Sequence, residues 1–246
     1  RRQWTGIREA PVAQHISYHN YVAEQIGIGV YAFNDVAGPA RRSGLMTSMS
    51  VQIKSSYKTR LSFGIAGSFS QFMIDRDKLI TEEPGDQVVL ERTSNQLIPD
   101  LATGLHWYSH QFHIGIALFN ILQTKSDLFD VMTPVSSTLD RTLFANASYR
   151  FGASNENGIS FEPSAILRLM TNAPIQFDVS GRIFYNQQLY IGSSYRHLDA
   201  LALLIGFDSR KLGIGYAYDI GLSNLNDHHS GSHEIVLTFK TRNNKQ

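Results

Sequence analysis

The sequence predicts an all-β protein, a transmembrane up-and-down antiparallel β-barrel of about 14 strands that occupies residues 1–246 as one domain. Three observations predict this fold. Apolar and polar residues alternate with a period of two over long segments, which is typical of strands with one apolar and one polar face. Short turns that contain Gly, Asn, Pro or Ser separate these segments. The chain contains no run of about 18 apolar residues that could form a transmembrane helix.

The alternation can be followed along each segment. Between 59 and 74, for example, Leu61, Phe63 and Ile65 alternate with Ser62 and Gly64. The expected strands are, in chain order, 1–7, 12–20, 26–34, 43–54, 59–74, 98–108, 111–121, 141–152, 158–170, 175–185, 189–196, 200–208, 211–220 and 232–241. Because the sequence begins with neither Met nor a signal peptide, the first strand is expected to be incomplete. Residues 242–246 are expected to form a periplasmic tail.

The later strands follow the same rule. Their alternating apolar positions are Phe161, Ala165 and Leu167 in 158–170, Phe177, Val179 and Ile183 in 175–185, Ile191 and Tyr195 in 189–196, Ile214, Tyr216 and Tyr218 in 211–220, and Ile235, Leu237 and Phe239 in 232–241. Aromatic residues stand near many strand ends, where the interfacial girdles of a membrane barrel lie. They are Trp4, Tyr18, Tyr57, Trp107, Tyr108, Tyr149, Tyr185, Tyr195 and Tyr218.

The lengths of the connections support this strand list. The longer connections, 35–42, 75–97, 122–140 and 221–231, all follow odd-numbered strands, and every connection after an even-numbered strand is short. In an up-and-down sheet this places the long connections on one rim and the short turns on the other, as in outer-membrane barrels. Because the expected strand number is even, both termini should face the periplasm, and the long loops should face outside.

The polar faces favour a membrane barrel over a soluble β-sandwich or barrel. They carry charged residues near mid-strand, and an interior can hold ionised groups only if it is wet or if the charges are paired. An apolar exterior in water would be a large adhesive patch. A lipid-facing exterior around a polar lumen avoids both problems. It also requires a closed sheet, because an open edge in lipid leaves backbone groups without hydrogen bonds.

The charged residues of the polar faces predict a charge network in the lumen. Glu162 and Arg168 lie on one expected strand, and Asp178 and Arg182 lie on the next, so they can pair across the hairpin in a suitable register. Asp219 belongs to the same predicted network. Paired charges of both signs favour a plugged or narrow lumen over an ion-selective pore. About 14 strands lie between the roughly 8 that side chains alone can fill and the roughly 16 of open porins, so both an open and a filled lumen are compatible with the sequence.

No motif indicates an enzyme or a cofactor site. Gly27 and Gly29 match the start of a dinucleotide-binding fingerprint, but a strand follows them where that motif needs a helix. Ser232, His233 and Glu234 are consecutive in an expected strand, where neighbours point to opposite faces and cannot form a catalytic triad. The chain has no cysteine, and its net charge of +1 gives no basic field for nucleic acid. We therefore expect no catalytic residue, no metal and no cofactor.

Three clusters of potential metal ligands have simpler interpretations. His106, His110 and His113 flank an expected hairpin turn at 109–110 instead of sharing a helix face. His228, His229 and His233 form a second cluster in or beside a loop, and His233 is expected to hydrogen-bond within the rim beside Glu234. The acidic residues of connection 75–97 lack the glycine spacing of an EF-hand and are expected to form a solvated loop.

Several motifs resemble those of one known family. They are Gly-Ile-Gly-Val at 27–30 followed by Asn-Asp-Val-Ala-Gly-Pro at 34–39, Gly-Ile-Gly-Tyr-Ala-Tyr-Asp at 213–219, Ser-Gly-Ser-His-Glu-Ile at 230–235, and Arg-Arg-Gln-Trp at 1–4. In order and spacing, over nearly the whole chain, these motifs resemble the PorP/SprF family of outer-membrane proteins of the type IX secretion and gliding machinery in Bacteroidota. The resemblance implies an integral outer-membrane barrel without known catalysis.

The resemblance also implies partners. Some relatives partner the periplasmic ring or the peptidoglycan-binding components of the secretion machine, and others deliver or hold a secreted adhesin or another exported cargo protein at the surface. The outer rim is the expected surface for an exported protein, and its candidate residues are Asn34, Asp35, Gly38, Pro39, Ser232, His233 and Glu234, together with loops 75–97, 122–140 and 221–231. The short-turn rim and the tail 242–246 are the expected surface for a periplasmic partner, and outer-membrane lipid is expected to surround the wall.

Two other functions are compatible with the same barrel. A passive porin for small molecules would use an open lumen, and a structural barrel would anchor the machine to the cell wall through its periplasmic side. The resemblance favours the first role, a non-enzymatic secretion and attachment component, with the passive porin as the alternative.

Overall fold

One antiparallel sheet forms nearly all of the protein in the computed structural model, which describes residues 1–75, 78, 95–126, 137–152, 158–222 and 230–241. The strands are β1 (Val12–Ala23), β2 (Ile26–Ala37), β3 (Ala40–Lys54), β4 (Arg60–Ile74), β5 (Asn95–Tyr108), β6 (Phe112–Phe119), β7 (Lys125–Ser126), β8 (Ser137–Thr138), β9 (Thr142–Tyr149), β10 (Phe151–Gly152), β11 (Ile159–Met170), β12 (Gln176–Tyr185), β13 (Leu189–Arg196), β14 (Ala200–Asp208), β15 (Leu212–Gly221) and β16 (Ser232–Phe239).

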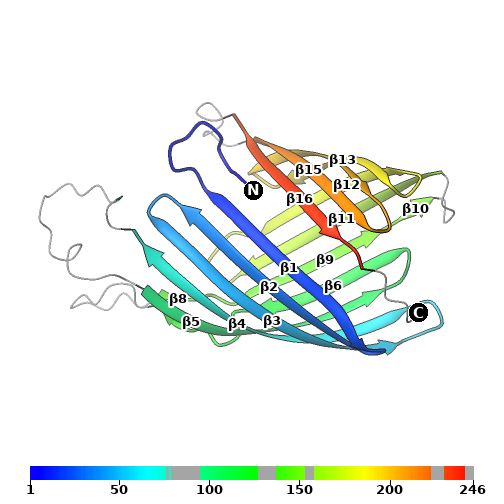
Figure 1. Ribbon diagram of the computed structural model, residues 1–246, viewed down its shortest axis with the longest axis horizontal. Coiled ribbons are helices and arrows are strands. Elements are labelled where there is room, and N and C mark those ends of the chain that lie inside the picture. The colour runs from blue at the N-terminus through cyan, green and yellow to red at the C-terminus, as the bar shows by residue number, and fades with distance from the viewer. Residues whose placement is uncertain (76–77, 79–94, 127–136, 153–157, 223–229, 242–246) are drawn as a thin grey trace, which may run out of the picture.

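Sequential neighbours pair throughout the sheet. The order of this 14-stranded sheet is β1-β2-β3-β4-β5-β6-β9-β11-β12-β13-β14-β15-β16, with the short β10 beside β11, while β7 and β8 form a separate two-stranded sheet. The sheet curls around an interior, so that β1 and β16 approach each other from opposite ends of the chain (Figure 1). These two edge strands are not paired with each other. The predicted fold class, an antiparallel up-and-down barrel of about 14 strands, is confirmed.

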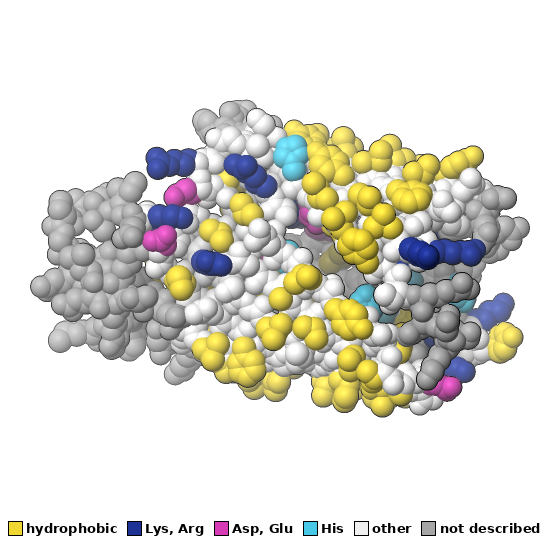
Figure 2. Space-filling model, viewed as in Figure 1, with side chains coloured by type: hydrophobic (Ala, Val, Ile, Leu, Met, Phe, Trp, Pro, Cys, Tyr) yellow, Lys and Arg dark blue, Asp and Glu magenta, His cyan; other side chains and the backbone are white. Residues whose placement is uncertain are grey.

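The distribution of side chains is the reverse of that in a soluble protein. Large apolar side chains on the outer face are exposed, for example Phe69 at 58% and Ile191 at 62%. The buried polar and charged residues include Asp100, Glu162 and Asp219, which all lie on the inner face. In Figure 2 hydrophobic side chains cover the middle of the outer surface, and most Lys and Arg side chains lie toward its two ends. Such a wall is stable when its outer face meets lipid, because the same face in water would be a very large apolar patch.

No helix among the described residues is long and apolar enough to cross a membrane.

The two rims of the sheet differ in their connections. The strand ends that are joined through 75–94, 120–141 and 222–231 lie at the rim where β1 begins, which we call the long-loop rim. The opposite rim carries the turns at 24–25, 55–59, 109–111, 186–188 and 209–211, and we call it the short-turn rim. The chain leaves β16 at the short-turn rim, whereas Arg1 lies in the wall close to the long-loop rim (Figure 1). The tail 242–246 lies outside the described residues.

The expected strand at 1–7 is wrong. Only Arg2 makes β-bridges, one to Val12 of β1 and one to His233 of β16, and the chain turns away after it. Trp4 and Gly6 adopt positive φ angles of 46° and 106°, which end an extended segment. Arg1 to Gln3 nevertheless occupy the space of one strand between β1 and β16 at this end of the wall.

The expected longer connection at 35–42 is also wrong. β2 continues to Ala37 and β3 begins at Ala40, so that the connection is a two-residue turn of Gly38 and Pro39. Gly38 has a φ of 57°, a left-handed conformation that glycine adopts without a steric cost. Asn34 and Asp35 disfavour strands, and the expected strand therefore ends at Asn34, but ladder pairing of Asp35 to both β1 and β3 outweighs that preference.

Candidate functional site: the long-loop rim and the lumen

The N-terminal segment brings the two groups of candidate rim residues onto one stretch of the long-loop rim. The backbone N–H of Trp4 donates to Ser232 Oγ at 3.2 Å, and that of Thr5 donates to the Gly231 carbonyl at 2.9 Å. Farther along the segment, the Gly38 N–H donates to the Glu9 carbonyl at 3.1 Å. Residues that are almost 200 positions apart in sequence therefore share one surface, which we call the rim site and define as 1–11, 34–39 and 230–234.

The entry into β16 explains why a glycine stands between two serines. Gly231 has a φ of 78°, and a Cβ added there would lie 2.7 Å from the Asp219 carbonyl oxygen and 2.8 Å from the Tyr218 ring. The Tyr218 hydroxyl donates to the Ser230 carbonyl oxygen at 3.2 Å. The tyrosine of the 213–219 segment therefore packs directly on the turn that leads into Ser232, and the two motifs form one unit.

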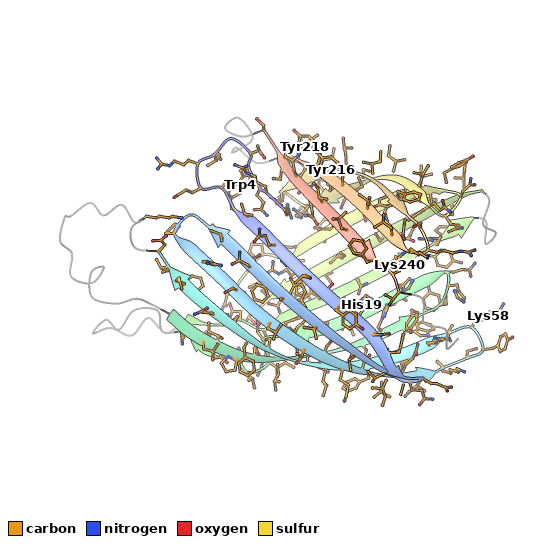
Figure 3. The ribbon with its side chains drawn as sticks, viewed as in Figure 1. Trp4, His19, Lys58, Tyr216, Tyr218 and Lys240 are labelled. Carbon is orange, nitrogen blue, oxygen red and sulfur yellow. The ribbon has the colours of Figure 1, made fainter. Side chains whose placement is uncertain are left out.

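Ser232 and His233, two of the candidate residues at the start of β16, point to opposite faces of the sheet. Ser232 lies opposite Asp219 on the inner face and is 6% exposed. His233 lies on the outer face, where its Nδ1 is 2.7 Å from the Tyr216 hydroxyl and its ring lies 5.2 Å from that of Tyr218. Figure 3 shows Trp4, Tyr216 and Tyr218 at this end of the wall and Lys58 at the other end. The outer part of the rim site is therefore aromatic.

The candidate residues at the end of β2 also point to opposite faces of the sheet. Asn34 faces outward, between Gln14 of β1 and an arginine of β3, and it is hydrogen-bonded to both. Asp35 faces inward, opposite Arg42, with its Oδ1 atom 3.6 Å from His15 Nε2. Gly38 and Pro39 form the turn that follows.

A group of charged side chains lines the lumen below the rim site. Arg1 forms an ion pair with Asp219 at 2.6 Å, and Asp219 is in turn 3.9 Å from Arg196. Arg196 also reaches Asp178 at 3.4 Å and Asp199 at 2.9 Å. These ion pairs connect β12, β13 and β15 with the N-terminus across the inner wall. They are partly exposed to the lumen and therefore contribute less than fully buried pairs would.

A second charged group lies nearer the short-turn rim. Glu162 of β11 accepts hydrogen bonds from Arg150 at 2.8 Å and from Arg182, which lies directly opposite on β12. Both guanidinium groups also lie over the Phe184 ring, at 4.2 Å for Arg150 and 5.3 Å for Arg182. One carboxylate, only 9% exposed in its side chain, therefore pairs with two cations that also interact with an aromatic face.

The predicted lumen residues are brought together only in part. Glu162 and Arg182 pair with each other, but Asp178 pairs with Arg196, and Asp219 pairs with Arg1. Arg168 meets no carboxylate among the described residues. Its guanidinium donates instead to the Gln176 side chain and lies 5.7 Å from the Phe144 ring. Within the described part of the chain, the paired members of the predicted network therefore fall into two charged groups in place of one.

The predicted network omitted Arg1, Arg150 and Arg196. Counting outward from the turn at 186–188 would have placed Arg196 opposite Asp178, because paired residues in that hairpin have positions that add to a constant. Arg150 could not be found in this way. It occupies the break between β9 and β10, where its backbone bonds to Gln111, and only its long side chain reaches Glu162.

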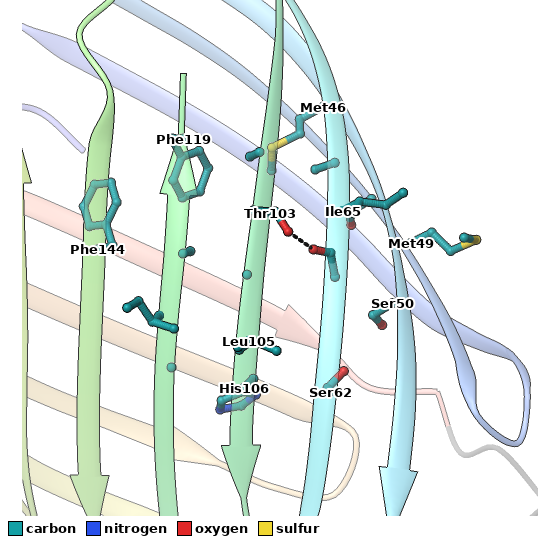
Figure 4. A pocket seen from close by; sticks show the side chains of 18 of the residues that line it. Met46, Met49, Ser50, Ser62, Ile65, Thr103, Leu105, His106, Phe119 and Phe144 are labelled. Carbon is teal, nitrogen blue, oxygen red and sulfur yellow. Dashed lines mark hydrogen bonds between the residues drawn. The ribbon is translucent and has the colours of Figure 1, made fainter. Parts of the chain in front are cut away.

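The opposite part of the inner wall is recessed and carries small side chains. A cavity of about 430 Å³ lies against β3–β6 and β9. Its small inner residues are Ser48, Ser50, Ser62, Gly64, Ala66, Ala102, Gly104, Gly115 and Ala117. Figure 4 shows the recess bounded by Met46, Phe119 and Phe144 toward one end and by His106 toward the other. No charged residue lines it.

The possible metal ligands do not converge where the structure describes them. His106 and His113 lie on neighbouring strands with stacked rings whose centroids are 5.5 Å apart. No group of three or more His, Cys, Asp or Glu residues that could hold a metal ion occurs among the described residues. His228, His229 and most of the acidic residues of connection 75–97 lie outside those residues. Gly27 and Gly29 lie within β2, as the strand interpretation requires.

Comparison with known proteins identifies one family. The family model described as "Type IX secretion system membrane protein PorP/SprF" matches residues 1–239, which is nearly the whole chain. No curated protein matches the sequence.

Proposed function

The chain belongs to the PorP/SprF family of type IX secretion system membrane proteins, and from this we propose that it is a non-enzymatic outer-membrane component that binds an exported surface protein or a periplasmic machine component. By binding, it would deliver or anchor that partner at the cell surface. The observation that carries the proposal is the family match over residues 1–239, which includes every strand of the wall. The apolar outer wall supports anchoring in lipid, and the rims remain for recognition.

The rim site is the proposed surface for an exported protein such as a secreted adhesin or another cargo carrying a type IX C-terminal domain. In this proposal the long-loop rim faces outside. The site is built from segments far apart in sequence that are held together by backbone hydrogen bonds, which gives a partner a fixed surface. The outward His233 and the aromatic residues around it supply the kind of contact that dominates protein interfaces.

The short-turn rim and the tail 242–246 are the proposed contacts for a periplasmic ring or peptidoglycan-binding component. The described turns there are short, and Lys58 is exposed at the tip of one of them. A partner on this side would meet a compact row of hairpins. The two rims could therefore serve different partners at the same time.

A pull-down from the native outer membrane in mild detergent tests the proposal. The tagged protein should recover an exported surface protein or a periplasmic machine component. A His233→Ala variant should reduce recovery of the exported protein severalfold, whereas Lys58→Ala, at the opposite rim, should leave that recovery unchanged. Recovery of the barrel alone, under conditions that preserve other envelope complexes, would contradict the proposal.

A second candidate function is a passive channel, and the recess beside β3–β6 favours it. The cavity of about 430 Å³ and its small uncharged lining leave space in the lumen that side chains do not fill. Single-channel recording separates the two functions. A large and steady conductance of the purified protein would support a channel, whereas silence would support the binding role alone.

A further inference from the structure

A polar row interrupts the apolar outer face of β1–β4 near the long-loop rim, and the row beyond it has Val12, Val36 and Met73 beside Arg41. One row of directly paired outward residues is apolar and consists of Ile16, Ala32, Leu45 and Phe69. The next outward row toward the long-loop rim is polar and consists of Gln14, Asn34, Ser43 and Gln71. The transition occurs at the same level on four adjacent strands. In a membrane barrel such a level is where the hydrocarbon ends and the lipid headgroups begin.

The polar row carries a chain of hydrogen bonds with a defined direction. Arg41 Nε donates to Asn34 Oδ1 at 2.7 Å, and Asn34 Nδ2 donates to Gln14 Oε1 at 3.1 Å. Both amide oxygens are therefore engaged by donors. The groups that remain at the two ends are the terminal N–H groups of the Arg41 guanidinium and the Nε2 amide of Gln14. The chain thus presents donors at both ends, which suits a ligand that only accepts hydrogen bonds.

Arg41 is placed to keep its charge at this level. It is the second residue of β3 and lies on the outer face, directly between Val36 of β2 and Met73 of β4. Its aliphatic stem can lie on these apolar neighbours while the exposed guanidinium bends toward Asn34. Arg2 stands on the same outward row, because it bridges Val12, which is itself paired with Val36. The row next to the polar one therefore carries two cations on its outer face.

We propose that Arg41, Asn34 and Gln14 bind the phosphate of a lipid headgroup at the long-loop rim. The guanidinium supplies charge and paired donors, which match a phosphate closely, and the two amides fix its position. The ligand is a lipid rather than a free anion because the apolar row with Ile16 and Ala32 lies directly below, where acyl chains would pack. The proposal rests on the location of the barrel in a membrane. It shares only Asn34 with the rim site proposed for an exported protein, and Arg41 and Gln14 lie outside that site.

Binding of short-chain lipids to the purified full-length chain in detergent micelles tests this site. The probes are dioctanoyl phosphatidic acid and dioctanoyl phosphatidylcholine, with affinity measured by native mass spectrometry. Phosphatidic acid should bind at least about tenfold more tightly than phosphatidylcholine, because the choline shields the phosphate charge. Arg41→Gln should weaken binding of phosphatidic acid by about tenfold. Lys58→Gln, an exposed cation at the opposite rim, should leave it unchanged.

Further controls decide how a change in lipid affinity is interpreted. Arg41→Gln must keep the heat-modified gel mobility of the native barrel, and Asn34→Ala supplies a second variant with the charge retained. Equal affinity of the native chain and both variants for phosphatidic acid would overturn the proposal. So would displacement of the lipid by inorganic phosphate at an equal concentration, which would indicate a free-anion site.

The pull-down of protein partners should not change in Arg41→Gln. A failure of the lipid-binding proposal is therefore distinct from a failure of the proposed function.

Discussion

Glu162 is the charged residue on which the lumen depends most. It is the carboxylate that Arg150 and Arg182 both contact, and its side chain is 9% exposed, whereas theirs are 33% and 37% exposed. The two guanidinium groups approach the same carboxylate and the same ring. Without the negative charge they would repel each other in a confined space. Among the described residues, the second charged group therefore has one carboxylate, because the other acceptor of Arg150, the Gln187 side chain, is an uncharged amide.

Replacing Glu162 by Gln should destabilise the folded barrel by about 2 kcal/mol, since it leaves two partly buried cations without a counter-ion. The amide keeps the shape of the side chain, so the loss reports on charge. Denaturant unfolding in micelles, followed by tryptophan fluorescence, measures the change.

The matched control is Asp208→Asn, which removes the carboxylate of the pair formed by Lys240 and Asp208. Both of these side chains are more than 40% exposed. The change in the free energy of unfolding should stay below about 1 kcal/mol, because exposed ion pairs contribute little. Equal losses in the two variants would show that the lumen around Glu162 is as wet as the rim.

Glycines in the later strands provide space for aromatic side chains of the inner wall. The Tyr190 ring of β13 lies over Gly206 of β14, and its hydroxyl lies against Gly215 of β15. Phe184, opposite Tyr190, belongs to the group that contacts the arginines. Across β12, β13, β14 and β15, glycines therefore lie next to a layer of aromatic side chains on the inner face.

Gly206→Ala should lower the free energy of unfolding by about 1–3 kcal/mol, because a Cβ there would overlap the Tyr190 ring and push it from its rotamer. Gly64→Ala, on the inner face of β4, is the control. Its nearest neighbours would be at 3.7 and 3.8 Å, an ordinary contact distance. That variant should be unchanged or slightly more stable, since alanine restricts the unfolded chain. Unfolding midpoints of both variants in the same detergent give the comparison.

Period-two alternation predicted the strands because lipid and lumen impose opposite polarity on successive residues. It located β4, β11 and β13 to within a few residues of their ends. The expected strand at 1–7 has no such alternation, and positive φ angles at Trp4 and Gly6 interrupt it after Arg2. Alternation carries no information on backbone conformation of that kind.

The contacts within the rim site and between the charged residues were harder to predict from the sequence than the strands were. Which side chains meet depends on strand register, and a shift of one residue moves every side chain to the other face. Glu162 and Arg182 could be paired because a short turn joins their strands. The contact between Trp4 and Ser232 joins opposite ends of the chain, and no local signal predicts it.

The whole wall has two unlike halves around one lumen. The inner faces of β11–β15 carry the ion pairs, whereas the recess along β3–β6 has an uncharged lining of mostly small side chains. The two groups of ion pairs therefore lie on one side of the lumen and the recess lies on the other, although Asp35, Arg42 and Asp100 also face inward from β2, β3 and β5. The seam between the edge strands β1 and β16 is spanned at its long-loop end by the backbone of Arg2. A barrel of this form presents its binding groups at the rims and keeps its wall for lipid.

The orientation of this wall in the membrane can be read by single-cysteine labelling, because the chain has no cysteine of its own. Glu9 is exposed at the long-loop rim, and Lys58 is exposed at the short-turn rim. In intact cells a membrane-impermeant maleimide should label Glu9→Cys. It should label Lys58→Cys only after the outer membrane is permeabilised.

This expectation follows from the asymmetry of the rims, since long connections face outside in outer-membrane barrels and short turns face the periplasm. The reverse labelling pattern would place the rim site in the periplasm. Its partner would then have to be a component of the machine instead of an exported protein. The headgroup site at Arg41 would in that case meet inner-leaflet phospholipids, which carry a phosphate as well. The orientation therefore decides which partner the rim site can meet, and it leaves the chemistry of the headgroup site unchanged.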